Sequence, residues 1–484
     1  MLFLGDCLTM TSPDHAGAVA VDGERIVAVG SAAELAARFP GMRRVRVERV
    51  TPGVHDAHAH PLFWGQALAE LDCSGLTDPR DVAARVAARA RELPEGAWIR
   101  GRGLLFDAYP TGPLLDEAAP RNPVLLDSRD IHSAWANAAA LRLAGIGRDT
   151  LNPEGGAILR AADGAPTGYL LERAADLVRR VLPPPARADL ERGLADLAGR
   201  GYTAVHAMAY AGFDDVEWLE ALAASHTLPL RVWCAVPAGR FRSVAPGWRG
   251  EDLEVAAVKM FVDGALGSRT AWMKRPYADG SLGIPLDSRE ALLGEGLAAL
   301  EAGYTLAIHA IGTRATAEVL DIVTELAPRA QRRIRIEHLQ HLDDDDAARL
   351  AGLPAAASMQ PVHLPGDAEL VRRHLPGRER EAFRFRDVVA AGIPLAFGSD
   401  APVARPDVAA GIRAAMAHAL DPDQSLTPAE ALHAFTRGAA LAAGWEGYGV
   451  LAPGARADLG LWEHDRLVGR VFRGRLEWLG PGSR

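Results

Sequence analysis

The chain has 484 residues, of which 49% are apolar and 24% are charged, a mixture typical of a globular protein with a large core. Its 53 basic and 62 acidic residues give a net charge of −9, so no basic excess is present to bind a phosphate backbone and we expect no nucleic-acid partner. No uninterrupted apolar stretch is long enough to span a bilayer, so we expect no membrane partner either. The cysteines, Cys7, Cys73 and Cys234, lie far apart, which fits a cytoplasmic protein without disulfides.

Both ends of the chain are predicted to form short strands. The first ten residues contain Asp6 and no basic region, which favours a first strand over a signal peptide. Asp22-Gly23 lies between two apolar runs, and its glycine can supply the positive φ of a tight hairpin turn. Strand-like runs return near the C-terminus. We therefore expect a small β-sandwich domain built from residues 1–52 and 448–484.

Short apolar, β-branched runs alternate with helical segments through the middle of the chain. The strand candidates are residues 50–54, 203–206, 230–236, 255–262, 305–310, 334–338, 355–360 and 394–398. The clearest helix candidates are residues 289–302, 314–327 and 384–391. Eight such alternations predict an α/β fold with a (β/α)₈ barrel, which we place at residues 53–62 and 183–447.

The first two strand candidates are separated by about 140 residues, too many for a loop in a compact domain. Residues 63–182 are therefore expected to form an inserted α/β subdomain that covers the active site.

Histidines and one aspartate fall at the ends of the predicted strands. His58 and His60 are two residues apart, so in a strand both can face one metal ion, whereas His55 is out of this register and is not expected to be a ligand. Three further candidates end later strands, at the edge where active sites of this barrel lie: His309, His338 and Asp400. Any one could be structural, but together they predict a metal site.

Only two of the 53 basic residues are lysines, Lys259 and Lys274. Lys259 lies in the fourth predicted strand, where a buried amine is costly unless it is paired or chemically altered. A neutral amine can add CO₂ to become a carbamate, an anion able to bridge two cations, which arginine cannot do. A salt bridge with Asp263 is the alternative.

Several motifs resemble those of a known family. The run 51–60 (TPGVHDAHAH) resembles the strand-one motif of the amidohydrolase superfamily, and 258–271 (VKMFVDGALGSRTA) resembles the strand-four signature of the YtcJ-like amidohydrolases, which include N-substituted formamide deformylase. Similar motifs follow in the expected places: RDIHSAWAN (129–137), IHAIG (308–312), RIEH (335–338) and FGSDAP (397–402). Two positions depart from the family pattern, Thr313 in place of an aspartate and His55 in place of a bulky apolar residue.

The resemblance implies a metal-bearing barrel, a terminal β-sandwich and a large insertion after strand one. The metal ligands that it implies are His58, His60, carbamylated Lys259, His309, His338 and Asp400. We expect two divalent ions, most simply Zn²⁺, with manganese, iron or cobalt also possible. A water shared by the ions would become hydroxide near neutral pH and attack a carbonyl carbon, while Asp400 acts as general base and then acid. The expected reaction is hydrolysis of the C–N bond of an N-substituted amide or formamide.

Five other residues are candidates for the substrate pocket. His132 in the insertion resembles the family's pocket histidine and could hydrogen-bond the substrate or an oxyanion, with a structural role as the alternative. Arg269 could bind a substrate carboxylate or form a structural ion pair. Trp64 and Phe106, together with Trp135, could line an apolar pocket or simply pack in a core.

Other functions on the same barrel remain open. One is an aminohydrolase (deaminase), and others are a different metal-dependent hydrolase, a metal-dependent isomerase or decarboxylase, and a non-catalytic scaffold. Related deaminases typically use one metal, lack the lysine and carry a glutamate where this chain has Gly312, so Lys259 and Gly312 favour amide hydrolysis. We expect a small-molecule substrate, and a homodimer is a possible assembly.

Overall fold

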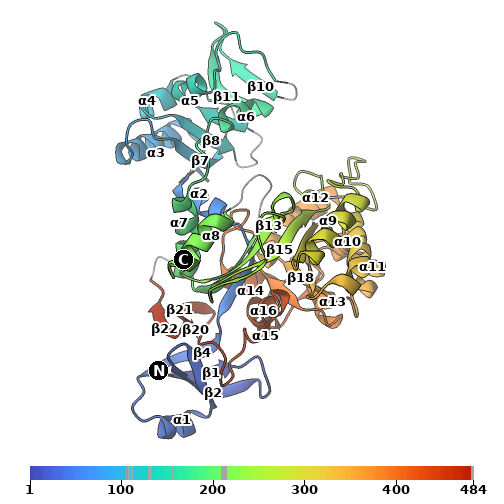
Figure 1. The fold of residues 1–484 in the computed structure, drawn as a ribbon. Coiled ribbons are helices and arrows are strands. Elements are labelled where there is room, and N and C mark those ends of the chain that lie inside the picture. Colours follow the sequence, from blue (N-terminus) through green and yellow to red (C-terminus); the bar gives the residue numbers. More distant parts are fainter. Residues whose placement is uncertain are drawn as a thin grey trace. The chain divides into compact units, whose positions relative to one another are not determined.

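The computed structural model describes residues 1–104, 106, 109–110, 113–128, 133–153, 156–208 and 215–480. The chain divides into two compact units (Figure 1). The first unit contains Met1–Gly65 and Arg187–Arg484, and the second contains Gln66–Ala186.

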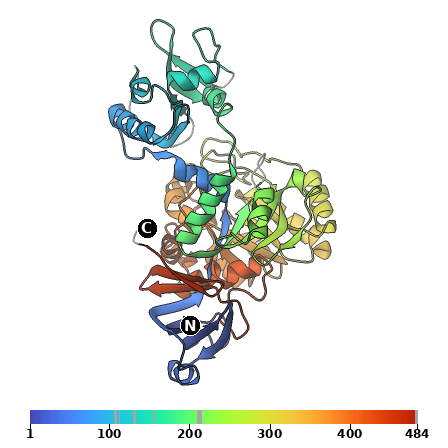
Figure 2. The same cartoon turned by 60° about the vertical axis from the view of Figure 1, so that its left-hand side comes forward.

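Strands from both chain ends form one sheet of the first unit. In the order of the sheet these strands are β22 (Arg475–Trp478), β21 (Arg466–Phe472), β20 (Leu459–Glu463), β4 (Arg44–Pro52), β1 (Leu2–Leu8), β2 (His15–Asp22) and β3 (Arg25–Gly30). Figure 2 shows the red C-terminal strands beside the blue N-terminal ones. The predicted hairpin is confirmed, because β2 and β3 pair around Gly23, whose φ is +53°.

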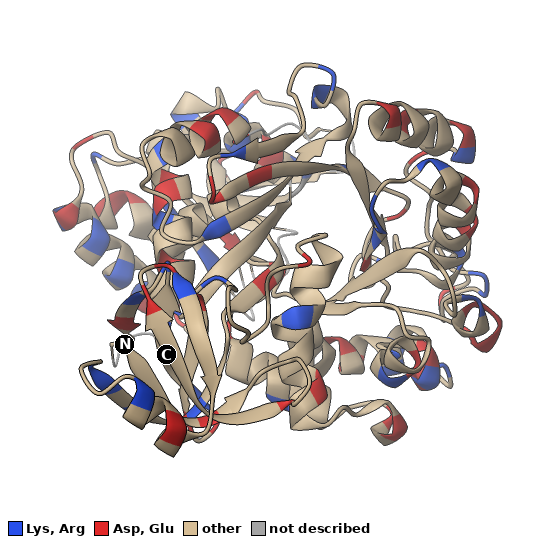
Figure 3. Ribbon diagram, turned by 60° about the horizontal axis from the view of Figure 1, so that its bottom comes forward, with Lys and Arg blue, Asp and Glu red and all other residues tan. Residues whose placement is uncertain are grey.

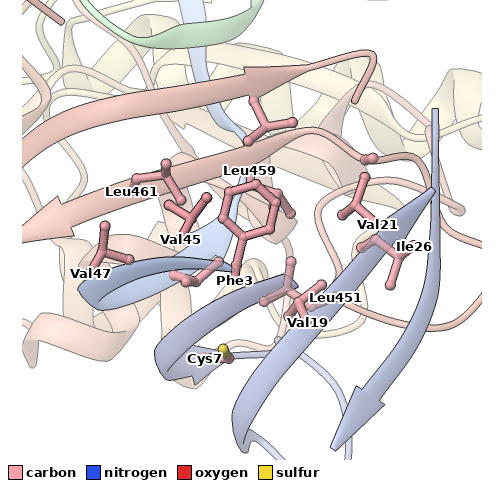
Figure 4. Close-up of a cluster of buried hydrophobic side chains, with 13 residues drawn as sticks. Phe3, Cys7, Val19, Val21, Ile26, Val45, Val47, Leu451, Leu459 and Leu461 are labelled. Carbon is pink, nitrogen blue, oxygen red and sulfur yellow. The ribbon is translucent and has the colours of Figure 1, made fainter. Parts of the chain in front are cut away.

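The terminal sheet encloses an apolar core of its own. Phe3 of β1, Val19 of β2 and Val45 of β4 pack against Leu459 and Leu461 of β20 (Figure 4). Burial of large apolar side chains from both chain ends supplies the energy that holds the ends together. The prediction of a composite terminal β domain is thereby confirmed.

The predicted (β/α)₈ barrel is also confirmed. Its parallel strands, in chain order and in spatial order alike, are β5 (Val54–Ala59), β12 (Tyr202–Met208), β13 (Arg231–Pro237), β15 (Leu253–Phe261), β16 (Thr305–Ala310), β17 (Ile334–His338), β18 (Ala355–Met359) and β19 (Leu395–Phe397). A short strand, β14 (Gly247–Arg249), pairs with β15 from outside this order.

The first and last strands meet at a seam that closes the barrel. The backbone N–H of Asp400 donates to the carbonyl of His58 at 2.6 Å, and that of His60 donates to Ala401 at 2.8 Å. A Cβ at Gly398 would lie only 2.4 Å from the backbone N of His58, so glycine is needed for this approach.

The predicted position of the first barrel strand is wrong by several residues. The sequence pattern predicts this strand at residues 50–54, but β4 ends at Pro52 in the terminal sheet and β5 begins at Val54. Gly53 separates the two strands, and a Cβ there would lie 2.1 Å from the hydroxyl of Thr203 on the neighbouring barrel strand. His55 and His58 therefore lie within β5 and not beyond its end.

Helices surround the barrel and connect its strands. They are α2 (Pro61–Ala69), α7 (Arg187–Gly199), α8 (Val216–Ala224), α9 (Arg289–Glu301), α10 (Thr313–Leu326), α11 (Asp344–Arg349), α12 (Leu364–His374), α13 (Phe385–Ala390), α14 (Val408–Met416), α15 (Pro428–Phe435) and α16 (Arg437–Ala442), while α1 (Ala32–Arg38) belongs to the terminal domain. The three helices predicted from sequence match α9, α10 and α13 to within two residues.

Residues of both charge signs are scattered over the outer helices (Figure 3). Within the described ranges, no helix is both long enough and apolar enough to cross a bilayer.

The second unit holds a mixed sheet with helices. The strands, in sheet order, are β10 (Gly156–Arg160), β11 (Pro166–Glu172), β9 (Ser133–Ala136), β8 (Val124–Ser128), β7 (Ile99–Leu104) and β6 (Leu71–Asp72). Its helices are α3 (Pro79–Glu92), α4 (Leu114–Ala118), α5 (Ala138–Leu143) and α6 (Arg173–Arg179). Buried apolar residues form two clusters in this unit, one around Val86 and Trp135 and the other around Leu170 and Val178.

Candidate metal centre

Predicted ligands from different strands converge at the carboxyl end of the barrel. One ligand atom from each of His58, His338 and Asp400 lies within 4.8 Å of the other two. The ring centre of His338 is 4.8 Å from that of His58 and 4.4 Å from that of His309. His60 adjoins the group, with its ring centre 5.6 Å from that of His58.

Two predicted ligands at the end of the first barrel strand, His58 and His60, are each oriented by a hydrogen bond on the Nδ1 side. Nδ1 of His58 lies 2.7 Å from Oε2 of Glu337, and a carboxylate can only accept there, so Nδ1 carries the proton. Nδ1 of His60 likewise donates to the carbonyl of Met208 at 2.9 Å. Burial and the neighbouring Lys259 lower the pKa of His58 to about 4, so its ring is neutral at pH 7 and its Nε2 presents a lone pair.

The later histidines are fixed in the same way. Nδ1 of His338 donates to Oε1 of Gln360 at 2.8 Å, which leaves Nε2 as the ligand atom. Nε2 of His309 donates to the carbonyl of Gly264 at 3.1 Å, which leaves Nδ1 as the ligand atom. Burial and Lys259 lower the pKa of His309 to about 3, and burial with the adjacent histidines holds the pKa of His338 well below its usual value.

Asp400 brings an anionic oxygen to the same point. One of its carboxylate oxygens lies 3.1 Å from Nε2 of His60 and 3.5 Å from Nε2 of His58. Burial favours the protonated acid, but the surrounding histidines outweigh it and hold the pKa of Asp400 well below its usual range. Its backbone φ of +58° is rare for a residue with a side chain and turns the chain at the barrel seam.

Lys259 lies in β15 with its amine buried. Among the described residues, none forms a hydrogen bond with its Nζ, although the side chain is almost completely buried. Burial lowers the pKa of Lys259 from 10.5 to about 8, even though Glu337 and Asp400 lie close enough to oppose the shift.

The alternative salt bridge between Lys259 and Asp263 is wrong. The carboxylate of Asp263 instead accepts backbone N–H groups from Trp272 at 2.8 Å, Ile311 at 3.0 Å and Gly312 at 2.8 Å. These bonds tie the segment after β15 to the end of β16, next to His309.

The residues at this point fit a divalent cation. His58, His309 and His338 turn lone pairs inward because their other ring nitrogens carry the protons, and Asp400 adds a carboxylate. Such acceptors repel one another unless a positive charge lies between them. Imidazole and carboxylate are ordinary ligands of zinc and related metals, and a hydrogen bond on the second ring nitrogen is typical of metal-binding histidines.

Each candidate pocket residue that the structure describes has a partner within its own unit. Arg269 forms an ion pair with Asp279 at 3.0 Å, in keeping with the structural alternative. The indole N–H of Trp64 donates to Asp196 at 2.8 Å, and the guanidinium of Arg200 lies 5.5 Å from its ring centre, so the side chain packs between α2 and α7.

Two of the remaining pocket candidates belong to the second unit. Phe106 and Trp135 pack edge to face at 5.8 Å, and Trp135 is part of the buried core there. His132 lies outside the described residues.

Both departures from the family pattern are buried. His55 packs against His206 and Trp445, with ring centres 5.6 and 5.9 Å away. The hydroxyl of Thr313 accepts the backbone N–H of Lys274 at 3.0 Å and so links the segment after β15 to α10.

Sequence reasoning missed the residues that support the ligands. Asp56 accepts the hydroxyl of Ser399 at 2.6 Å, and Glu337 and Gln360 orient His58 and His338. The sequence places Glu337 in the RIEH motif and Gln360 at the end of a predicted strand, but it assigns no role to either residue. Their roles depend on contacts across strands, which a single sequence does not encode.

Comparisons with known proteins agree with this architecture. The model of the amidohydrolase family matches residues 48–470, and that of the bacterial imidazolonepropionase-like composite domain matches residues 17–41. The chain is 33% identical over 387 residues to the protein YtcJ of Bacillus subtilis, which covers 75% of this chain and 72% of that one. It is 30% identical over 493 residues to N-substituted formamide deformylase of Arthrobacter pascens, covering 93% and 90% of the two chains.

A solved structure supports the same assignment. The crystal structure of an uncharacterized metal-dependent hydrolase from Pyrococcus furiosus superposes with a TM-score of 0.81 at 25% identity, over 96% of this chain and 98% of that one. Because the family model matches most of the chain, including the strands that carry the candidate ligands, the chain belongs to the amidohydrolase family, a family of metal-dependent hydrolases.

Proposed function

We propose that the protein hydrolyses a C–N bond of an N-substituted amide or formamide at the centre formed by His58, His60, Lys259, His309, His338 and Asp400. The observation that carries this proposal is the buried amine of Lys259, which lacks a hydrogen-bonding partner among the described residues. It lies beside a set of proton-free histidine nitrogens and a carboxylate. The likeness to N-substituted formamide deformylase supports the choice of bond.

Lys259 is proposed to be carbamylated. Because its pKa is lowered to about 8, a sizeable fraction of the amine is neutral at physiological pH. The nitrogen lone pair would attack the carbon of CO₂, one C=O electron pair would move to oxygen, and the nitrogen would lose a proton to solvent. The product is an anion with two oxygen donors in place of a cation, which removes the unfavourable burial of an unpaired ammonium.

Two divalent ions, most simply zinc, would be held by these six side chains. Divalent ions in such a donor set lower the pKa of a bound water to about 7 and polarise a carbonyl oxygen. Histidine nitrogens together with carboxylate and carbamate oxygens suit zinc, and manganese, iron or cobalt could replace it.

Asp400 is proposed to move the proton. Its lowered pKa keeps the carboxylate ionised, so it has a free lone pair to accept a proton from the attacking water. It would then pass that proton to the nitrogen of the leaving amine, so that a neutral amine departs. His132 is kept as the proposed contact for the substrate oxygen.

The structure around Gly312 argues against the deaminase alternative. A Cβ at this position would lie 2.1 Å from the carbonyl oxygen of Trp272, so the glutamate that related deaminases carry there would not fit without moving the backbone.

Metal analysis combined with a substrate panel tests the proposal. We expect close to two metal ions per chain by elemental analysis. We also expect a native mass that exceeds the acid-treated mass by one CO₂, and hydrolysis of N-substituted formamides or amides. No bound metal, or one metal with an unmodified lysine and release of ammonia from amino-substituted heterocycles, would overturn it.

A further inference from the structure

A completely buried arginine, Arg335, crosses the interior of the barrel. It lies on β17, two residues before Glu337, and its side chain has no solvent exposure. Its Nη1 lies 2.7 Å from Nδ1 of His206 on β12, and its Nη2 donates to the carbonyl of Ala57 on β5 at 2.6 Å. Nη2 also lies 3.1 Å from the hydroxyl of Ser358 on β18.

The same guanidinium touches a further strand and a carboxylate. Its carbon lies 4.4 Å from the ring centre of Trp233 on β13. Its Nε donates to Oε1 of Glu337 at 2.8 Å, and Nη2 lies 3.3 Å from Oε2. One side chain thus connects β5, β12, β13 and β18 to its own strand.

Such a residue is unusual in this part of a barrel. Layers of bulky apolar side chains normally fill the interior, and a buried charge is costly unless its geometry and partners compensate. Here the carboxylate partner is Glu337, and that carboxylate in turn accepts the Nδ1 proton of His58 at 2.7 Å. Arg335, Glu337 and His58 therefore form a continuous buried chain that ends at the metal centre.

We propose that Arg335 is a positioning residue of the metal centre, which holds the carboxylate of Glu337 in the orientation that aims Nε2 of His58 at the metal. The inference rests on the proposed function only in assuming that His58 is a ligand. It extends the hydrogen-bonded support of the ligand by one residue, to a group that touches neither metal nor substrate.

The planar fork of arginine is suited to this task. Nε and Nη2 together engage both oxygens of Glu337, while Nη1 and Nη2 are anchored to His206, Ala57 and Ser358. Because arginine only donates, Nδ1 of His206 is the acceptor and its proton sits on Nε2. A lysine has a single nitrogen and could not hold the carboxylate and the three anchors at once.

Metal affinity measured without any substrate tests this role. The full-length protein is stripped with a chelator, and the Kd for Zn²⁺ is then measured by competition with a coloured chelator for wild type, Arg335→Met and Arg335→Lys. Loss of a residue that supports a metal-binding histidine typically weakens metal binding by about 10–100-fold. We expect that loss in Arg335→Met, a smaller loss in Arg335→Lys, and an altered visible spectrum when Co²⁺ replaces zinc.

Arg231→Met is the matched control. Arg231 is another buried barrel arginine with carboxylate partners, Asp252 and Asp458, but it does not contact Glu337. We expect this variant to melt at a lower temperature than wild type and to bind Zn²⁺ with unchanged affinity. If Arg231→Met weakens Zn²⁺ binding as much as Arg335→Met does, the effect is general destabilisation and the proposal is overturned.

The remaining outcomes also decide the question. A folded Arg335→Met variant with wild-type Zn²⁺ affinity and an unchanged Co²⁺ spectrum shows that Arg335 is purely structural. If Arg335→Met does not fold, the Arg335→Lys variant decides by the same two measurements. If the wild-type protein binds no metal, both the proposed function and this inference are overturned. If it binds metal but hydrolyses no amide, only the proposed function fails, and the Zn²⁺ affinities of the Arg335 variants still test this inference.

Discussion

The amide oxygen of Gln360 lies 2.8 Å from Nδ1 of His338. The orientation of that amide is set in turn, because its Nε2 donates to the carbonyl of Ser358 at 3.3 Å. Gln360 thus presents an acceptor and not a donor to the histidine. This choice of atom decides which nitrogen of His338 remains available as a ligand.

Replacing Gln360 with methionine removes that acceptor while nearly preserving the volume of the side chain. We expect His338 to lose its fixed orientation and the affinity for Zn²⁺ to fall by about 10–100-fold. Chelator competition on the purified protein measures this loss. Gln424→Met is the control, since Gln424 is a buried amide that instead caps the backbone of Arg386 and Asp387. Equal losses in the two variants would contradict a specific role of Gln360.

Lys259→Gln removes the amine that we propose to be carbamylated. We expect the variant to lose the acid-labile CO₂ from its native mass and to bind less metal. Its activity should fall by more than the roughly 10–100-fold that is typical when a residue that only supports a ligand is lost. Native mass spectrometry and elemental analysis measure the first two effects. The matched control is Lys274→Gln, which removes the other lysine, an amine that is paired with Asp343 and Asp346. A mass difference that persists in Lys259→Gln would place the carbamate elsewhere.

Asp400→Asn tests the proposed proton transfer. Asparagine tolerates the positive φ of this position, so the backbone is expected to keep its shape. Loss of a general base typically lowers kcat by about 10²–10⁴-fold, and we expect a decrease in that range or larger because Asp400 is also a proposed ligand. The control is Asp407→Asn, which keeps a side-chain oxygen to cap α14. Comparable kcat values for wild type and Asp400→Asn would rule out this role.

His341 makes the stability of the fold depend on pH. Its Nδ1 lies 3.1 Å from the carbonyl of Ile311, and burial lowers the pKa of His341 to about 4. Between pH 6.5 and 4 the unfolded chain binds a proton here that the folded chain does not, so this residue makes the fold less stable as pH falls through that window. The slope is about 1 kcal/mol per pH unit.

Substitution of His341 by asparagine isolates that contribution. Asparagine can keep a donor near Ile311 and does not titrate. We therefore expect the free energy of unfolding of the His341→Asn variant to fall less steeply than that of wild type from pH 6.5 to 4. Denaturant titrations across this window measure the two slopes. Parallel curves would show that His341 does not contribute.

Much of the fold, and the clustering of several candidate site residues, could be predicted from the sequence. Short apolar runs ending in His309, His338 and Asp400 mark parallel strands whose carboxyl ends meet at one edge, because side-chain alternation and barrel topology leave few other arrangements. Lys259 is conspicuous because it is one of only two lysines among 53 basic residues. The terminal domain followed from strand patterns at both chain ends.

The supporting residues could not be predicted in the same way. Glu337 orients a histidine 279 positions away, and Arg335 reaches strands far from it in the sequence. These partnerships arise only when the barrel closes. The boundary of the first strand was misjudged because β4 and β5 are separated only by Gly53, and the local pattern of apolar residues does not distinguish two strands of different sheets.

The seam between β5 and β19 also means that the centre can form only after nearly all of the barrel has been synthesised. His60 and Asp400, whose side chains meet at 3.1 Å, are 340 positions apart in the chain. During translation His58 and His60 are made early, and Asp400 is made only after the last barrel strand, β19. A growing or prematurely terminated polypeptide therefore lacks one of the proposed ligands, and complete metal binding is expected only from a chain whose barrel is finished and closed.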